Sequence, residues 1–196
     1  MFFLTRKAKG LFRRILKFSR NLQYALLSTN ERVEGRPTKY QPILAMGKGK
    51  IYFENDVKIG VPPSPGFWSS YCYIESRYPT AEICIGENSW INNGFSAIAE
   101  KCSIKIGRNC LIGHEVVILD SDFHSLDPKE RHKINEHVET GNVIISDNVF
   151  IGSRAVILKN SMIGTGCVIG AGAVVSGVFP SNSLIAGNPA KIIRYL

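Results

Sequence analysis

A branched aliphatic residue returns at every sixth position through residues 145–175, and this period constrains the fold more than any other feature of the chain. The series consists of Ile145, Ile151, Ile157, Ile163, Ile169 and Val175. A period of six fits neither a helix of 3.6 residues per turn nor a simple alternating strand. It is typical of a coil of short strands, with six residues on each side and three sides to each turn.

The residues between these aliphatic positions favour the same all-β coil. Glycine directly follows three of them, at Gly152, Gly164 and Gly170. A small or modest side chain stands four positions after each aliphatic residue, at Val149, Ala155, Ser161, Cys167 and Ala173. We expect the aliphatic side chains to fill the interior of the coil and the smaller ones to fit beside its tight corners.

An excursion breaks the repeat at about residues 119–143. Ile118 ends an earlier series, and its distance of 27 residues from Ile145 is not a multiple of six. Polar insertions into a regular scaffold tend to carry function. The excursion contains Asp120, Asp122, His124, Asp127, Lys129, Glu130, Arg131, His132 and His137.

The N-terminal segment carries nearly all of the net charge of +8. Its basic residues are Arg6, Lys7, Lys9, Arg13, Arg14, Lys17 and Arg20, whereas the first acidic residue is Glu31. Apolar residues at helical spacing predict a helix over residues 2–28 with a basic opposite face. Such a helix either lies on an anionic membrane surface or docks on its own domain or a neighbouring subunit. No nucleic-acid recognition motif accompanies the charge, so we expect no nucleic-acid partner.

The distribution of residue types along the chain predicts its division into segments and its cellular location. Residues 1–49 are expected to form the helix and a polar linker, and residues 50–196 the coil domain. No segment is long and apolar enough to span a bilayer, and residues 1–4 place their apolar side chains before the basic ones, unlike a signal peptide. The five cysteines show no CxxC spacing and predict reduced thiols in a cytoplasmic protein. Peripheral contact with the inner face of the membrane stays open.

Three features together resemble one family. They are the hexapeptide coil, the D-x-D-x-H excursion from Asp120 to His124, and the ending Ala186-Gly-Asn-Pro-Ala-Lys-Ile-Ile-Arg194. Over residues 50–196 the chain resembles the left-handed parallel β-helix acetyltransferases. Its features are similar to the galactoside and maltose acetyltransferase branch, and closest to the O-acetyltransferases of bacterial surface polysaccharides. The left-handed turn is implied by the resemblance alone, since general chirality rules favour right-handed crossovers.

The resemblance implies direct transfer of an acetyl group from acetyl-CoA to a sugar hydroxyl, in the biosynthesis of O-antigen (lipopolysaccharide), capsule or exopolysaccharide. A hydroxyl is a poor nucleophile near neutral pH, so a base must take its proton. His124 aligns with the family's catalytic base. Asp120 or Asp122 would hold its ring, and the sequence does not choose between them. Asn92 or Asn93 would bind the acceptor or stabilise the oxyanion, and both stay open.

The same resemblance implies where the donor binds and how the chains assemble. Small residues along the coil would line the groove for the pantetheine arm, and the last basic residues would meet the phosphates. These residues are Gly152, Ser153, Gly170, Ala171, Ser176, Lys191 and Arg194. The family forms homotrimers with a site between adjacent coils. Arg131 either binds an acidic acceptor or pairs with an acid such as Glu130, and His114 is expected at the surface or a subunit contact.

Three other functions fit parts of the pattern. An N-acetyltransferase of an amino-sugar nucleotide would use the same fold and base, and a non-catalytic scaffold would use the fold alone. A zinc enzyme would need three histidines on rigid coil walls. His132 and His137 lie in the excursion, so His114 alone stands on a wall, and we expect no metal.

Overall fold

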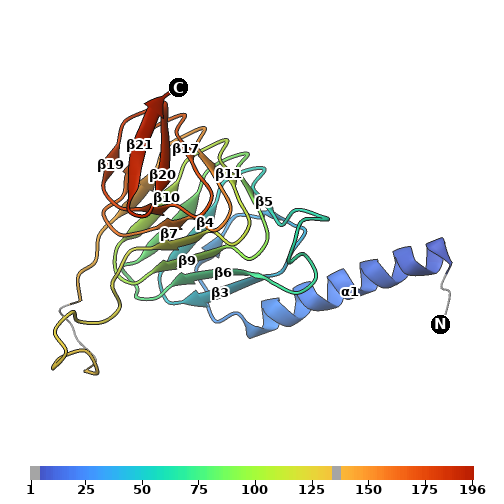
Figure 1. Ribbon diagram of the computed structural model, residues 1–196. Coiled ribbons are helices and arrows are strands. Elements are labelled where there is room, and N and C mark those ends of the chain that lie inside the picture. Colours follow the sequence, from blue (N-terminus) through green and yellow to red (C-terminus); the bar gives the residue numbers. More distant parts are fainter. Residues whose placement is uncertain (1–4, 134–137) are drawn as a thin grey trace.

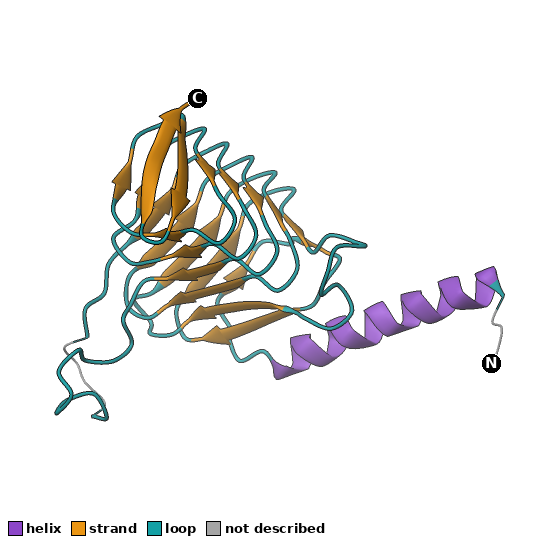
Figure 2. Ribbon diagram, viewed as in Figure 1, coloured by secondary structure: helices purple, strands orange, loops and turns teal. Residues whose placement is uncertain are grey.

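The chain forms a three-sided coil of short strands with one long helix at its base, as the computed structural model shows (Figure 1). The structure describes residues 5–133 and 138–196. Consecutive strands pass to the next side of the coil, so each side is a sheet built from every third strand (Figure 2). Among the described strands, all pairings are parallel except that of β20 with β21, which closes the last turn.

The three sheets contain the following strands. Sheet 1 consists of β1 (Val33–Glu34), β4 (Lys50–Phe53), β7 (Glu82–Ile85), β10 (Ser103–Ile106), β13 (Val143–Ile145), β16 (Met162–Ile163) and β19 (Val178–Phe179). Sheet 2 consists of β2 (Thr38–Lys39), β5 (Lys58–Ile59), β8 (Trp90–Ile91), β11 (Leu111–Ile112), β14 (Phe150–Ile151), β17 (Val168–Ile169), β20 (Ser183–Gly187) and β21 (Ala190–Tyr195). Sheet 3 consists of β3 (Ile43–Gly47), β6 (Cys72–Ser76), β9 (Ser96–Ala99), β12 (Val117–Leu119), β15 (Val156–Ile157) and β18 (Val174–Val175).

The six-residue period places one aliphatic side chain of each strand inside the coil. Ile151 lies in register between Ile112 and Ile169, and Ile157 between Ile118 and Val175. These side chains are at most 3% exposed, so they form continuous apolar columns along the axis. The three parallel sheets and their buried columns confirm the predicted parallel β-helix, and they are consistent with its left-handed form.

The predicted corner residues also lie inside. Ala155, Cys167 and Ala173 are fully buried, and so is Ser161, whose hydroxyl donates to the carbonyl of Leu158 at 2.6 Å. A larger side chain at any of these positions would meet the neighbouring turns of the coil.

The coil begins earlier than the expected residue 50. Strands β1, β2 and β3 precede that position and pair with β4, β5 and β6. The first turn escaped detection because it lacks the aliphatic period and uses the buried polar Gln41, whose amide bonds to Gly66 and Gly94. The division of the chain into two domains stays a prediction.

The helix α1 spans Arg6–Leu27, with Thr5 as its N-cap and Ser28 as its C-cap. The predicted helix began at residue 2; residues 1–4, including the segment compared with a signal peptide, lie outside the described residues. No helix in the described part of the chain combines the length and apolar character needed to cross a membrane. The cytoplasmic location stays a prediction.

Candidate functional site

One corner of the coil stacks the residues that follow four neighbouring strands of sheet 2. We call it the 2–3 corner, and it comprises residues 92–94, 113–115, 152–154 and 170–172. Neighbouring strands are about 4.8 Å apart, so these segments form a ladder along the coil axis. The ladder brings four of the predicted donor-binding residues together, Gly152, Ser153, Gly170 and Ala171.

The glycines at this corner are required by the stacking of the turns. A Cβ on Gly152 would lie 2.5 Å from the backbone N of Ala171, and one on Gly170 would lie 3.0 Å from Cβ of Ala186. The side chains of Ser153 and Ala171 are short and exposed. The backbone of the corner is therefore accessible to a slender molecule lying along the coil, as a pantetheine arm is.

The structure separates the two candidate asparagines. Asn93 is fully buried, and its amide binds the loop of residues 61–70. Its Oδ1 accepts from the N–H of Val61 at 3.0 Å, and its Nδ2 lies 3.0–3.1 Å from the carbonyls of Val61, Ser64 and Pro65. Because these contacts occupy both ends of the amide, Asn93 is a structural residue that shapes the loop.

Asn92 is half-buried, and its Oδ1 accepts only from the adjacent N–H of Asn93, at 2.7 Å, among the contacts of the described residues. It lines a mostly apolar groove with Val61, Trp90, Leu111, Ile112, Gly113 and Phe150. Its Nδ2 donates to no group among the described residues and is therefore available to a molecule bound in this groove.

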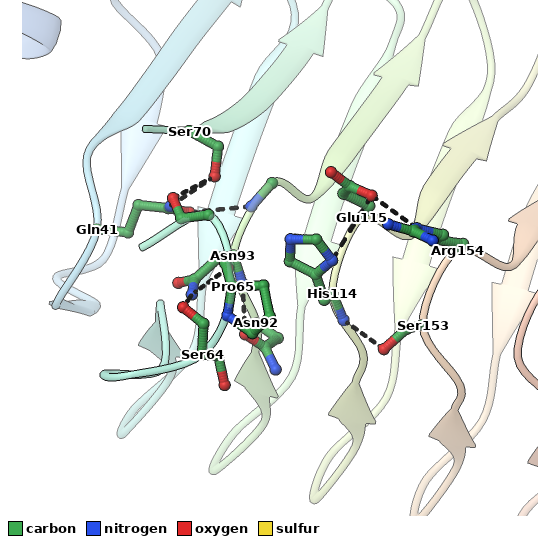
Figure 3. Close-up of polar contacts among 12 residues, drawn as sticks. Gln41, Ser64, Pro65, Ser70, Asn92, Asn93, His114, Glu115, Ser153 and Arg154 are labelled. Atoms are coloured by element: carbon green, nitrogen blue, oxygen red, sulfur yellow. Dashed lines mark hydrogen bonds and ion pairs between the residues drawn. The ribbon is translucent and has the colours of Figure 1, made fainter. Parts of the chain in front are cut away.

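His114 lies one turn further along the ladder (Figure 3). Its side chain is only 12% exposed, because the loop of residues 61–70 covers it; a Cβ on Gly66 would lie 3.0 Å from Nε2. Nδ1 lies 3.6 Å from a carboxylate oxygen of Glu115, which also accepts from Arg154 at 2.9 Å. Nε2 is enclosed without a hydrogen-bond partner among the described residues. The subunit contact expected of His114 stays a prediction.

The excursion leaves the coil between sheets 3 and 1, at the 3–1 corner, as expected: β12 ends at Leu119 and β13 begins at Val143. It returns to its own root, where Ser121 forms an antiparallel bridge with Thr140. Ser121 also donates to the carboxylate of Glu100 and accepts from the N–H of Phe123 at 2.9 Å. The start of the excursion is therefore rigidly attached to the coil.

His124 follows directly and is exposed. Its ring Nδ1 lies 3.1 Å from the carbonyl oxygen of Arg131. A carbonyl only accepts hydrogen bonds, so we assign the proton to Nδ1. This tautomer leaves the lone pair of Nε2 pointing away from the backbone contact, as a general base requires.

Neither predicted aspartate holds the ring of His124 in the structure. Asp120 is buried and accepts from the N–H groups of Glu100, Lys101 and Cys102 at 2.7–3.2 Å. Burial raises its pKa despite these hydrogen bonds. Asp122 instead pairs with Lys159 at 2.8 Å. Both acids instead fix the root of the excursion, and the expected role of a carboxylate beside His124 stays a prediction.

Sequence reasoning missed the groups that support the excursion. Lys159 bridges Asp122 and Glu139, both at 2.8 Å. The guanidinium of Arg77 lies 4.9 Å from the ring centroid of Phe123, a residue in the left-handed backbone region with φ of 59°. The positive φ turns the chain sharply just before His124. Nothing in the local sequence signals these contacts, since their partners come from other turns of the coil.

Arg77 belongs to a polar network on the outer face of β6. Its Nε donates to Glu75 at 2.8 Å, and the hydroxyl of Tyr73 donates to the same carboxylate at 2.8 Å. Burial would raise the pKa of Glu75, but the hydrogen bonds from Arg77 and Tyr73 outweigh it and lower the pKa. Burial is the main cause that raises the pKa of Tyr73, to about 12.

The remaining predicted residues are dispersed. Ser176 follows β18 at the 3–1 corner, away from the glycines of the 2–3 corner, and Lys191 and Arg194 are exposed on β21. The guanidinium of Arg131 donates to the carbonyl of Leu126 at 3.1 Å, and Glu130 pairs with Lys133 at 2.7 Å. These placements leave the predicted roles in donor and acceptor binding untested.

The histidines considered for zinc do not form a site in the described part of the chain. His132 is exposed in the excursion, His114 lies at the 2–3 corner, and His137 lies outside the described residues. Among residues 5–133 and 138–196, no group of three histidine, cysteine or acidic side chains is placed to bind a metal ion.

One protomer does not bring Asn92 and His124 together. Asn92 precedes sheet 3 and His124 follows it, so the length of a sheet-3 strand, roughly 10–15 Å, separates the two corners. Figure 1 shows the excursion extending from the coil on the side opposite α1. The two residues therefore lie at different corners of one coil.

Sequence comparison finds relatives that share this coil. The profile of the bacterial transferase hexapeptide family (six repeats) matches residues 142–177. The putative lipopolysaccharide biosynthesis O-acetyl transferase WbbJ of Escherichia coli (strain K12) is 38% identical over 149 residues, which cover 73% of this chain and 74% of that protein.

The polysialic acid O-acetyltransferase of Escherichia coli O1:K1 is 41% identical over 115 residues, 58% of this chain. The matched region spans only 36% of that relative's length. Among solved structures, a hexapeptide-repeat acetyltransferase from Vibrio cholerae O1 biovar eltor, complexed with acetyl coenzyme A, superposes with a TM-score of 0.55. It is 23% identical, with 98% of this chain and 90% of that chain covered, and shows that the two share a fold.

Proposed function

Because this chain belongs to the hexapeptide-repeat acetyltransferase family, we propose that it transfers an acetyl group from acetyl-CoA to a sugar hydroxyl in the biosynthesis of a surface polysaccharide. The observation that carries the proposal is the ring of His124, held through Nδ1 by the carbonyl of Arg131 with Nε2 open. The names of two relatives, which refer to polysialic acid and to lipopolysaccharide biosynthesis, support the class of acceptor.

His124 supplies the base. Its Nε2 accepts the proton of the acceptor hydroxyl as the hydroxyl oxygen attacks the thioester carbonyl. The same nitrogen then returns that proton to the departing thiolate sulfur, so the imidazole is neutral again after each turnover. The backbone carbonyl of Arg131 replaces the carboxylate that orients the base in many other enzymes, and it accepts the Nδ1 proton throughout.

Asn92 supplies the hydrogen-bond donor at the opposite corner. Its Nδ2 is reachable from the groove beside it, so it either stabilises the developing oxyanion or binds a hydroxyl of the acceptor. We assign these roles to Asn92 rather than to Asn93, because the loop of residues 61–70 occupies the amide of Asn93.

The 2–3 corner fits the donor. Ser153 and Ala171 are short and exposed, and the glycines beside them keep the backbone within reach of a slender arm carrying amide groups. Lys191 and Arg194 offer cations for phosphate groups from the exposed strand β21. When bound there, acetyl-CoA supplies the activated acetyl group.

The active unit is a homotrimer, in which the excursion of one protomer reaches the 2–3 corner of the next. Two observations support it: Asn92 and His124 lie at different corners of one coil, and the outer face of sheet 2 exposes Leu111 and Phe150, which are 53% and 47% exposed. An apolar surface of this kind is typical of an interface. Each site would then contain residues of two chains.

Acceptor-dependent release of CoA tests the proposal. Wild type, His124→Ala and His132→Ala are assayed with free sugars, sugar nucleotides and lipid-linked oligosaccharides. His132 is an exposed histidine of the same excursion and serves as the matched control. We expect a loss of about 10²-fold or more for His124→Ala alone, the contribution of a general base.

The other outcomes are equally informative. Equal rates in wild type and a folded His124→Ala would remove His124 from its role. Activity confined to amino-sugar nucleotides would indicate an N-acetyltransferase. No turnover with any acceptor, together with no binding of acetyl-CoA, would indicate a scaffold.

A further inference from the structure

The helix α1 is attached to the coil by its polar side. The guanidinium of Arg20 donates to the carbonyls of Phe67 and Ser70 at 3.0 and 2.6 Å. The ammonium of Lys17 lies 4.8 Å from the ring centroid of Tyr40, and the rings of Tyr24 and Tyr71 are 4.7 Å apart. Lys17, Arg20 and Tyr24 follow one another at helical spacing, so a single face of α1 makes these contacts.

The apolar side of α1 faces away from the coil. No residue of the helix is buried. At about 100° per residue, Leu22 lies roughly 160° around the helix from Arg20. The exposed stripe consists of Leu11 (61%), Phe12 (59%), Ile15 (57%), Phe18 (70%), Leu22 (49%) and Leu26 (77%). An amphipathic helix normally buries its apolar stripe in its own domain. Because the stripe of α1 is exposed, it is available to bind a membrane or another protein.

The coil adds an aromatic side chain beside the stripe. Trp68, on the loop that accepts Arg20, is 44% exposed and borders a hollow lined by Lys9, Phe12, Arg13 and Leu16. Tryptophan is enriched where an apolar phase meets water, because its ring is amphipathic.

The charge of α1 indicates which surface the stripe meets. The helix carries seven basic residues and no acidic one. Lys7 and Arg14 border the edge of the stripe next to Phe18, and Lys9 lies about 60° beyond Phe12 at the other edge. Their long side chains can extend along the apolar surface to its polar rim. Two copies of so basic a helix would repel each other at close approach, whereas an anionic surface attracts them.

We propose that α1 binds the surface of an anionic lipid bilayer, with its apolar stripe inserted at the interface and its basic edges on the lipid headgroups. Lys17, Arg20 and Tyr24 attach the opposite face of the same helix to the coil. Membrane binding through α1 would therefore hold the coil in a fixed orientation relative to the bilayer. The C-terminal end of α1 is also tied to β3, where Ser28 Oγ accepts from the N–H of Ala45 at 3.0 Å.

Sedimentation with vesicles tests the inference on the full chain. Wild type is mixed with vesicles of phosphatidylcholine alone or with about 30% phosphatidylglycerol, at low salt and at high salt. Two double variants change one feature each: Ile15→Gln with Leu22→Gln removes part of the apolar stripe, and Lys7→Glu with Arg14→Glu reverses the two charges at one edge of it. The matched control, Lys48→Glu with Lys105→Glu, makes the same change in net charge at exposed positions of the coil.

We expect binding to the anionic vesicles only, weakened by salt. Each basic residue near the surface contributes about fivefold in affinity, so the Lys7/Arg14 variant should bind about 30-fold more weakly or worse. The Ile15/Leu22 variant should lose binding at unchanged charge, and the Lys48/Lys105 control should bind within about fivefold of wild type. Thermal unfolding should be nearly unchanged in all of them, since no residue of α1 is buried.

Three results would overturn the inference. They are no binding of wild type to anionic vesicles, equal weakening by the control and the Lys7/Arg14 variant, or a smaller assembly for Ile15→Gln/Leu22→Gln than for wild type by light scattering. The last result would show that a second copy covers the stripe. The assay needs no acceptor or acetyl-CoA, so its outcome is independent of the proposed reaction.

Discussion

Replacing Asn93 by alanine removes the amide that holds the loop of residues 61–70 to the coil. One acceptor contact and three donor contacts are lost. An amide NH₂ has two hydrogens to share among its three carbonyls, so at most three hydrogen bonds have full strength. At about 1 kcal/mol each, the variant should lose about 3 kcal/mol of unfolding free energy. Water entering the exposed loop would reduce this loss to about 1–2 kcal/mol.

Asn92→Ala is the matched control, because it makes the same substitution at the neighbouring residue. Asn92 Oδ1 accepts only a local N–H, so its loss should cost under about 1 kcal/mol of stability. For a chain of this size 1 kcal/mol shifts Tm by about 2–4 °C. Asn93→Ala should therefore melt about 2–12 °C below wild type, and further below it than Asn92→Ala, which should stay within about 4 °C of wild type. Circular dichroism at one fixed protein concentration measures both.

CoA release should show the opposite ranking of the two variants. Below its melting range Asn93→Ala should retain much of its CoA release, whereas Asn92→Ala should lose about 10²-fold, as for removal of an oxyanion donor. Limited proteolysis should cleave the loop of residues 61–70 faster in Asn93→Ala. A stable but inactive Asn93→Ala, or an unstable Asn92→Ala that retains activity, would refute these assignments. Either result would show that Asn93 is the functional donor or that Asn92 is the structural residue.

Two further predictions concern acids near the excursion. Asp120→Asn places an amide NH₂ against backbone N–H donors and should cost about 2–4 kcal/mol, whereas Asp122→Asn weakens one half-buried ion pair and should cost about 1 kcal/mol in urea unfolding. A strong loss of turnover in a stable Asp122→Asn would support Asp122 as the partner of the base. Glu75 has a lowered pKa in the folded state, so its contribution is full above the unfolded pKa of about 4.3 and is lost as pH falls through the folded pKa. Glu75→Gln should lower the urea midpoint at pH 7 and flatten its fall toward acid, and the exposed Glu87→Gln should do neither.

The sequence by itself determined the coil and its interior. Because one aliphatic residue per side must be buried in every turn, the period of six is visible in the letters from Ile145 to Val175. The same count located the excursion, since 27 residues cannot fit the repeat. The period did not reveal the first turn of the coil, because this turn lacks the aliphatic repeat and buries the hydrogen-bonded amide of Gln41.

Only the tertiary structure decided what the polar residues do. Asn92 and Asn93 are chemically identical neighbours, and the loop that packs on one of them separates their roles. The spacing of Asp120 and Asp122 before His124 predicted that one of them would hold the histidine ring. In the structure Asp120 accepts from backbone N–H groups of another turn and Asp122 pairs with Lys159, so the ring of His124 instead bonds to a backbone carbonyl. Likewise, the helical period of α1 predicted an apolar stripe, while the contacts of Arg20 decided that it faces outward. Hydrogen-bond partners come from distant turns of the coil, so no local pattern contains them.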